Sequence, residues 1–196
     1  MSRMLDELKH DGFTLTPLIM VAKTGLTEPA RRPNDFLYYL PDGTEVFPDP
    51  EKMYSKSKIE RFLSCERKYA FSYLAGIREP ESAAAAAGVS QHAELEGWLK
   101  HGTIPTSRNM INSGALKEFP KPFTPGMGVE IAFAFIVEAG NEYCVLWGFK
   151  DVEVPGVVTD LKTKGDLSWA MTEEQLLDDL QAAVYAVDNF LRHEIK

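Results

Sequence analysis

Cysteine is scarce in this chain of 196 residues, which contains only Cys65 and Cys144. Two cysteines cannot build a disulfide framework, and no CxxC motif or Cys/His cluster indicates structural zinc. Long apolar runs are also missing, since no stretch approaches the roughly 18 residues of a membrane-spanning helix. The N-terminus lacks the apolar core of a signal peptide. These absences exclude disulfide-rich secreted and membrane-spanning classes, and we expect a cytoplasmic protein with no membrane partner.

An excess of positive charge is missing as well. The chain has 21 Lys and Arg against 29 Asp and Glu, which gives a formal net charge of −8. A duplex-binding surface needs a basic footprint, because phosphate neutralisation supplies much of the affinity. Net charge does not describe local patches, however, and a metal-dependent nuclease carries carboxylates that count against it until cations bind. Composition therefore leaves nucleic acid open as a partner.

The chain length suits one domain with a small appendage. We expect residues 1–50 to form an N-terminal extension, in which the β-forming runs 35–40 and 44–47 flank a Pro41-Asp42-Gly43 turn as a β-hairpin. Residues 51–196 would form the main domain. A capping box at Ser57 and Glu60 begins its helical part.

The main domain reads as helices, then a β meander, then a closing helix. A first helix is expected from about residue 55, a second over about 66–74 and a third over 83–99. A loop is expected over 105–128, and strands over 129–137, 143–149, 152–154 and 157–159. The closing helix would begin at Thr172, with Gln175 completing its cap, and would bury a stripe at three-four spacing. The predicted fold class is therefore α/β or α+β.

The Pro155-Gly156 pair determines which candidate catalytic residues face each other across the predicted hairpin. If these two residues form the turn, Asp151 lies opposite Asp160, and alternation puts Lys162 on the face of Asp160. Two facing carboxylates repel each other unless a cation lies between them, and a divalent metal ion is the natural one. The lysine can then orient water for attack on a phosphodiester. A one-residue slip would remove this arrangement and leave a hairpin with solvated side chains.

Four motifs follow one another along about residues 54–185. They are Cys65-Glu66-Arg67-Lys68-Tyr69 after an opening helix, Gly88-x-x-x-His92-x-x-Leu95-Glu96, the pair Gly148-x-x-Asp151 and Asp160-x-Lys162-Thr163, and Gln181-x-x-x-Tyr185. In this order they resemble the RecB-like nucleases of the PD-(D/E)XK type, which include recombination exonucleases and the exonucleases of CRISPR adaptation.

The resemblance implies a restriction-endonuclease-like core, with a central mixed sheet flanked by helices, and a catalytic centre made of Asp151, Asp160 and Lys162. Asp151 and Asp160 would bind Mg²⁺ or Mn²⁺, hard ions that prefer oxygen ligands. His92 and the Leu161 carbonyl would complete the metal site. Lys162 would position the nucleophilic water.

The resemblance also implies contacts with DNA. Gln181 and Tyr185 would steady the motif or the DNA backbone from one helical face. Arg61, Arg67 and Lys68 would contact phosphates. The simpler alternatives are a core position for the tyrosine and solvated positions for the basic residues. Without the surrounding motif, His92 would be interpreted as an ordinary packed or surface residue of a helix.

Several features depart from the family pattern. No cysteine follows Tyr185, so no iron–sulfur cluster is expected, and Cys65 should be a small buried apolar residue. The short separation of Asp151 and Asp160 predicts a trimmed hairpin. Relatives continue beyond the position of Lys196, which would make this protein a minimal version, a fragment, or half of a site completed by another chain. Glu130, a single acidic residue beside Gly128, is not assigned to the site.

The expected activity is Mg²⁺- or Mn²⁺-dependent hydrolysis of DNA phosphodiester bonds in recombination, repair or replication, including phage-encoded systems. We expect an exonuclease acting on single- or double-stranded DNA ends, because no feature indicates base readout. One alternative is a catalytically inactive DNA-binding or assembly subunit, with a protein partner or as a homo-oligomer. Another is an unrelated metal-dependent phosphoesterase that acts on a small substrate.

Overall fold

The computed structural model describes residues 10–77, 79–80, 82–112, 114–162 and 171–193. The chain divides into two compact units, which we call unit 1 and unit 2. Unit 1 comprises Met1–Gly76, Ala132–Gly148 and Asp179–Lys196, and unit 2 comprises Ile77–Ile131 and Phe149–Asp178. A mixed α+β fold, as the sequence predicts, is confirmed. The division of the chain at residue 50 stays a prediction.

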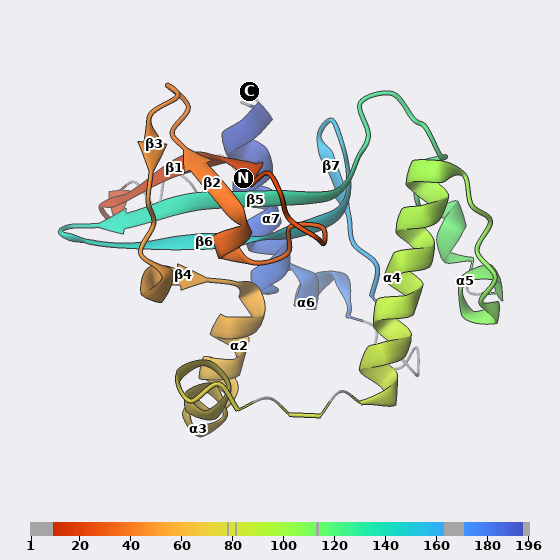
Figure 1. Cartoon of the computed structure of the whole chain (residues 1–196), viewed down its shortest axis with the longest axis horizontal. Helices are drawn as coiled ribbons and strands as arrows, with labels where there is room; N and C mark the ends of the chain where they lie inside the picture. The colour runs from red at the N-terminus through yellow and green to blue at the C-terminus, as the bar shows by residue number, and fades with distance from the viewer. Residues whose placement is uncertain (1–9, 78, 81, 113, 163–170, 194–196) are drawn as a thin grey trace. The chain divides into compact units, whose positions relative to one another are not determined.

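One sheet contains all seven strands of the described residues (Figure 1). Their order is β3-β2-β1-β5-β6-β4, and β7 pairs with β6. Strand β4 is parallel to β6, whereas β1 is antiparallel to β2 and β5. The strands are β1 (Phe13–Ala22), β2 (Phe36–Tyr39), β3 (Glu45–Val46), β4 (Met53–Tyr54), β5 (Gly128–Ala139), β6 (Glu142–Val154) and β7 (Val157–Thr159).

The N-terminal part of unit 1 contains the predicted hairpin. Strands β2 and β3 pair through Tyr38 and Val46, and the backbone N–H of Thr44 donates to the Asp42 carboxylate in the turn. Strand β1 was not predicted. Its burial does not alternate, because five of its ten residues are half-buried, four are exposed and one is buried, so the period-two signal of a strand is absent.

Helices α2 (Lys56–Ser64) and α3 (Glu66–Tyr69) and the π-helix η3 (Ala70–Leu74) follow in unit 1. The predicted cap at Ser57 is wrong, because the Ser55 hydroxyl accepts the Lys58 N–H and the helix begins directly after it. Cys65 was predicted to be buried, and this is also wrong. It joins α2 to α3 in an extended conformation at an exposed bend.

The predicted closing helix is two helices, α6 (Glu173–Leu177) in unit 2 and α7 (Leu180–His193) in unit 1. The cap by Thr172 and Gln175 is confirmed. The chain restarts as α7 because the Asp179 carboxylate accepts the Ala182 N–H. One core cluster of unit 1 forms where α7 packs on β5, and its buried members are Val184, Val187, Phe133 and Phe135.

Unit 2 contains α4 (Ala83–His101), which begins after the Ser82 cap and ends at Gly102, where φ is 69°. Leu95 and Leu99 on this helix pack in one cluster with Val152 and Leu161. The predicted loop 105–128 contains α5 (Arg108–Asn112) and the 3-10 turn η4 (Ala115–Lys117). Two more 3-10 turns, η1 (Pro33–Asp35) and η2 (Pro50–Lys52), lie in unit 1. None of the described helices is long and apolar enough to cross a membrane.

Candidate metal centre

The β6–β7 hairpin of unit 2 has the predicted register. Val154 pairs with Val157 and Val152 with Thr159, so Pro155 and Gly156 form the two-residue turn. Gly156 has a φ of 83°, a conformation that glycine adopts without strain. Strand β7 ends at Thr159, one residue before Asp160.

Asp151 lies near the end of this hairpin and is buried. Its Oδ2 accepts the backbone N–H of Leu161 at 2.7 Å. The Leu161 side chain is buried in the core of unit 2 with Leu95 and Val152. Apolar packing and one buried hydrogen bond therefore fix the position of the carboxylate. The predicted metal contact by the Leu161 carbonyl stays a prediction.

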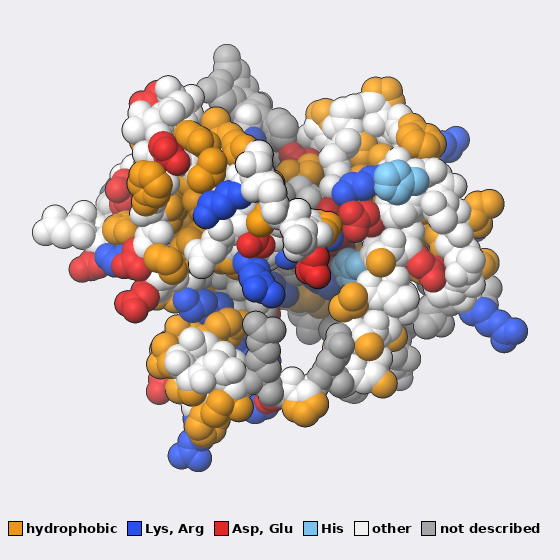
Figure 2. All heavy atoms as spheres, viewed as in Figure 1, with side chains coloured by type: hydrophobic (Ala, Val, Ile, Leu, Met, Phe, Trp, Pro, Cys, Tyr) orange, Lys and Arg blue, Asp and Glu red, His pale blue; other side chains and the backbone are white. Residues whose placement is uncertain are grey.

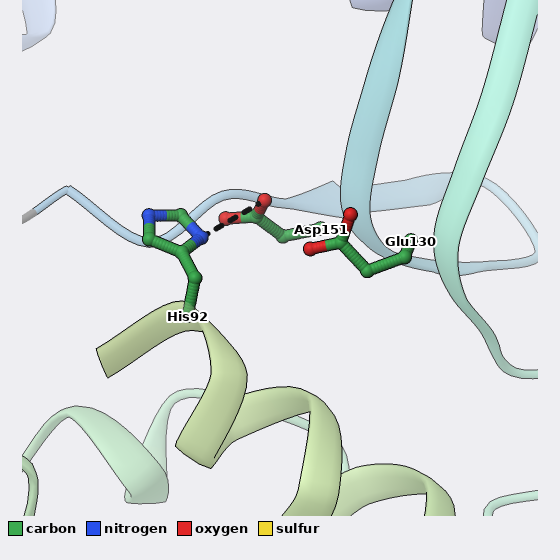
Figure 3. Close-up of side chains that lie close together, drawn as sticks. All are labelled: His92, Glu130 and Asp151. Carbon is green, nitrogen blue, oxygen red and sulfur yellow. Dashed lines mark ion pairs between the residues drawn. The ribbon is translucent and has the colours of Figure 1, made fainter. Parts of the chain in front are cut away.

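His92 points from α4 toward this carboxylate (Figure 3), and its Nδ1 lies 3.3 Å from Oδ1 of Asp151. The hydrogen bond to Asp151 is the main cause that raises the pKa of His92 above its ordinary value of 6.5. Burial acts in the opposite direction, and the negative charges of Asp151, Asp160 and Glu130 raise this pKa further. The imidazole therefore lies in a strongly negative environment that also favours a cation.

Glu130 is the residue that sequence reasoning missed. It extends from β5 toward Asp151 (Figure 3), and ligand atoms of His92, Glu130 and Asp151 all lie within 4.8 Å of one another. The only signal in the sequence was the Gly-x-Glu run at the start of the predicted strand. One acidic residue on a strand is common, and its backbone conformation was not predictable.

Glu130 has a φ of 57°, in the left-handed region. For a residue with a side chain this conformation costs about 1–2 kcal/mol. The backbone is crowded here, since a Cβ added to Gly128 would lie 2.1 Å from Cδ1 of Ile131. A strained residue beside a histidine and a buried aspartate is typical of a functional site, where the surrounding structure holds the strain.

These three side chains fit a divalent metal ion. Two ligand atoms that each lie about 2.0–2.5 Å from one ion are at most about 5 Å apart, and the separations in this group satisfy that limit. Two carboxylates suit Mg²⁺ or Mn²⁺, and an imidazole favours the transition metal. His92, Glu130 and Asp151 all belong to unit 2.

Asp160 and Lys162 lie beside this group but pair with each other. Lys162 Nζ is 2.5 Å from Oδ2 of Asp160, and the lysine side chain is 51% exposed whereas the aspartate side chain is 18% exposed. Asp160 is not part of the group of three, although its charge raises the pKa of His92. Thr163, which ends the Asp-x-Lys-Thr motif, lies outside the described residues.

Gln181 and Tyr185 belong to α7 in unit 1. The Gln181 carbonyl accepts a hydrogen bond from Lys56 Nζ at 3.1 Å, and its amide donates to the Tyr185 hydroxyl. The Tyr185 ring lies edge-on to Phe133, with the centroids 5.7 Å apart. These contacts connect the start of α2 with α7. A role of the two residues in DNA binding stays a prediction.

The three predicted phosphate-binding residues also belong to unit 1. Arg67 and Lys68 are exposed on α3, and Arg61 is half-buried in the last turn of α2.

Comparisons with known protein families, curated protein sequences and solved structures found no match for this chain. The arguments for function therefore come from the residues themselves.

Proposed function

We propose that this protein is a metal-dependent DNA nuclease with a PD-(D/E)XK-type core that hydrolyses phosphodiester bonds, acting as an exonuclease on DNA ends. The observation that carries the proposal is the convergence of His92, Glu130 and Asp151 from α4, β5 and β6. The strained backbone of Glu130 and the buried hydrogen bond of Asp151 support it, because both hold ligand groups in place. The resemblance of the four sequence motifs to those of RecB-like nucleases is the reason for proposing DNA as the substrate.

In this proposal His92, Glu130 and Asp151 hold Mg²⁺ or Mn²⁺, and Asp160 is a further ligand candidate. A bound ion of this kind supplies positive charge to a phosphoryl oxygen and lowers the pKa of a coordinated water. His92 must be neutral to bind the ion, so its proton leaves on binding. The half-exposed Lys162 ammonium is held by Asp160 and orients the attacking water.

Cleavage of end-labelled single- and double-stranded DNA tests the proposal, with Mg²⁺, Mn²⁺ or chelator present. We expect cleavage only with metal, and a loss of about 10²- to 10⁴-fold in rate for Lys162→Ala, the range for a positioned acid–base group. Lys100→Ala is the matched control, since Lys100 pairs with Glu96 on the surface of α4. If the folded protein cuts neither substrate with either metal, the nuclease proposal is wrong, and a DNA-binding or assembly subunit becomes the better account.

A further inference from the structure

Unit 1 carries a row of partly exposed aromatic rings on α2, α3 and η3. The Phe62 ring lies edge-on to Tyr69 at 5.3 Å, and Tyr69 lies 5.4 Å from Tyr73, both measured between ring centroids. Phe62 is 46% exposed and Tyr73 is 42% exposed. We call Phe62, Tyr69 and Tyr73 the aromatic row. Both of its ends present ring surface to solvent.

Basic residues are frequent in the segment that carries the aromatic row. Residues 56–74 contain five Lys and Arg against two Glu, in a chain with a net charge of −8. Lys58 lies over the Tyr54 ring at 4.3 Å, while Lys56 contacts Glu60 and Gln181. The five are Lys56, Lys58, Arg61, Arg67 and Lys68.

Arg67 and Lys68 directly precede Tyr69 in the chain and are exposed. Hydrophobic side chains gather on the outer surface of α2 and α3, with basic side chains at their edge (Figure 2). This helical segment is therefore locally positive and locally aromatic in an acidic protein. The segment belongs to unit 1, whereas the candidate metal ligands belong to unit 2.

We propose that the aromatic row and its basic neighbours bind single-stranded DNA. Unpaired bases stack on the exposed faces of Phe62 and Tyr73, and Arg67 and Lys68 contact the phosphates. Exposed aromatic rings beside basic side chains are the usual means of binding a single strand without sequence preference. A duplex keeps its base faces inside the helix and offers none to these rings. This inference deepens the proposed function, on which it rests for the choice of DNA.

Fluorescence anisotropy of a labelled oligo-dT strand and of a duplex of equal length tests the inference, with EDTA present throughout. We expect Phe62→Ala and Tyr73→Ala each to weaken single-strand binding at least about fivefold, the lower limit for one stacked base. Tyr73→Phe should retain binding, because it keeps the ring. Phe47→Ala is the matched control, since Phe47 is 83% exposed in the same unit but lies on the N-terminal hairpin.

Salt dependence provides a second readout. Arg67→Ala and Lys68→Ala should each reduce the slope of log K against log salt by about 0.7, the value for one phosphate contact on a single strand. Equal affinity for strand and duplex, or unchanged binding by the aromatic variants, would overturn the inference. Binding of the intact protein to vesicles of phosphatidylcholine and phosphatidylglycerol, without binding to oligo-dT, would overturn it too.

The two proposals can fail separately. Asp151→Asn should abolish cleavage and leave oligo-dT binding unchanged. Binding that depends on the aromatic row, in a protein that cuts no DNA with any metal, would refute the nuclease and support the strand-binding surface. If the Phe62→Ala and Tyr73→Ala variants cleave DNA and bind oligo-dT like the original protein, the strand-binding surface is refuted and the nuclease is supported.

Discussion

The backbone N–H of Leu161 donates to one oxygen of the Asp151 carboxylate, while the other oxygen lies 3.3 Å from Nδ1 of His92. One buried carboxylate therefore connects β6, the segment after β7 and helix α4. The Leu161 side chain packs with Leu95 of α4 in the same apolar cluster, so the elements that carry the site are held by the core of unit 2. The candidate ligands are consequently positioned before any ion binds.

The left-handed backbone of Glu130 predicts a trade-off between stability and metal binding. Glu130→Gly should be more stable than Glu130→Ala by about 1 kcal/mol, because only glycine adopts this φ without strain. Both variants should bind Mn²⁺ more weakly than the original protein. Urea denaturation and Mn²⁺ titration measure the two effects. Glu138→Gly is the control on the same strand, where glycine should lower stability by about 0.5–1 kcal/mol. Equal stability of the two Glu130 variants would contradict strain at this position.

The raised pKa of His92 predicts how metal binding depends on pH. Asp151 and the neighbouring charges raise this pKa above 6.5. When the pH is lowered, protonation of His92 should therefore begin to weaken the apparent Mn²⁺ affinity already at a pH above 6.5. In the metal-free protein the sign is opposite: the stabilising contact of protonated His92 with Asp151 is complete below pH 6.5 and is lost as the pH rises through the raised pKa. Calorimetric titration from pH 5.5 to 8.5 checks the first effect. His92→Gln is the control, and a pH dependence identical to that of the original protein would exclude His92 as its cause.

The buried ion pair of Lys150 and Glu153 predicts a large loss of stability when one partner is removed. The ammonium lies 2.8 Å from the carboxylate, and the two side chains are 0% and 8% exposed. Glu153→Leu should lower the free energy of unfolding by about 3–5 kcal/mol, because the buried ammonium loses this short contact with a carboxylate. The double variant Lys150→Met/Glu153→Leu should recover most of this loss. A double variant no more stable than the single one in urea would contradict the explanation.

The exposed pair of Lys100 and Glu96 is the matched control for that experiment. Lys100 Nζ lies 2.7 Å from Oε1 of Glu96, close to the 2.8 Å of the buried pair, but the side chains are 36% and 30% exposed. Glu96→Leu should therefore cost less than about 1 kcal/mol, as is usual for ion pairs at the surface. The comparison separates the effect of burial from the effect of pairing.

The hydroxyl of Tyr185 predicts a smaller, local effect. Tyr185→Phe removes the hydrogen bond with Gln181 but keeps the edge-on contact with Phe133. The free energy of unfolding should fall by about 0.5–1.5 kcal/mol. If the two residues only connect α2 with α7, the DNA cleavage rate at saturating metal should not change. A large loss of cleavage with intact stability would instead support the predicted contact with DNA.

Features that depend on neighbouring residues could be predicted from the sequence. The β6–β7 register followed from the Pro155-Gly156 turn and side-chain alternation, and the cap of α6 followed from Thr172 and Gln175. The resemblance assigned His92 and Asp151 to one metal site; the two side chains lie 3.3 Å apart, and their binding of a shared ion stays a prediction.

Features that depend on distant segments could not be predicted. Strand β1 pairs with a strand more than 100 residues later, since Phe13 lies opposite Ala139. The place of Glu130 in the site depends on its contact with side chains from α4 and β6, together with a φ of 57°. No periodicity in the sequence indicates either feature. The pairing of Asp160 with Lys162 is likewise a matter of side-chain geometry, which alternation along a strand does not determine.

Mn²⁺ binding by the Asp151→Asn variant tests the central claim most directly, because asparagine keeps an oxygen for the Leu161 N–H but removes the charge. Free Mn²⁺ measured by electron paramagnetic resonance gives the affinity of both proteins. We expect about one tightly bound ion in the original protein and at least about tenfold weaker binding in the variant, since even residues that only orient a ligand contribute about 10- to 100-fold. Equal affinity in the two proteins would show that His92, Glu130 and Asp151 do not form a metal site.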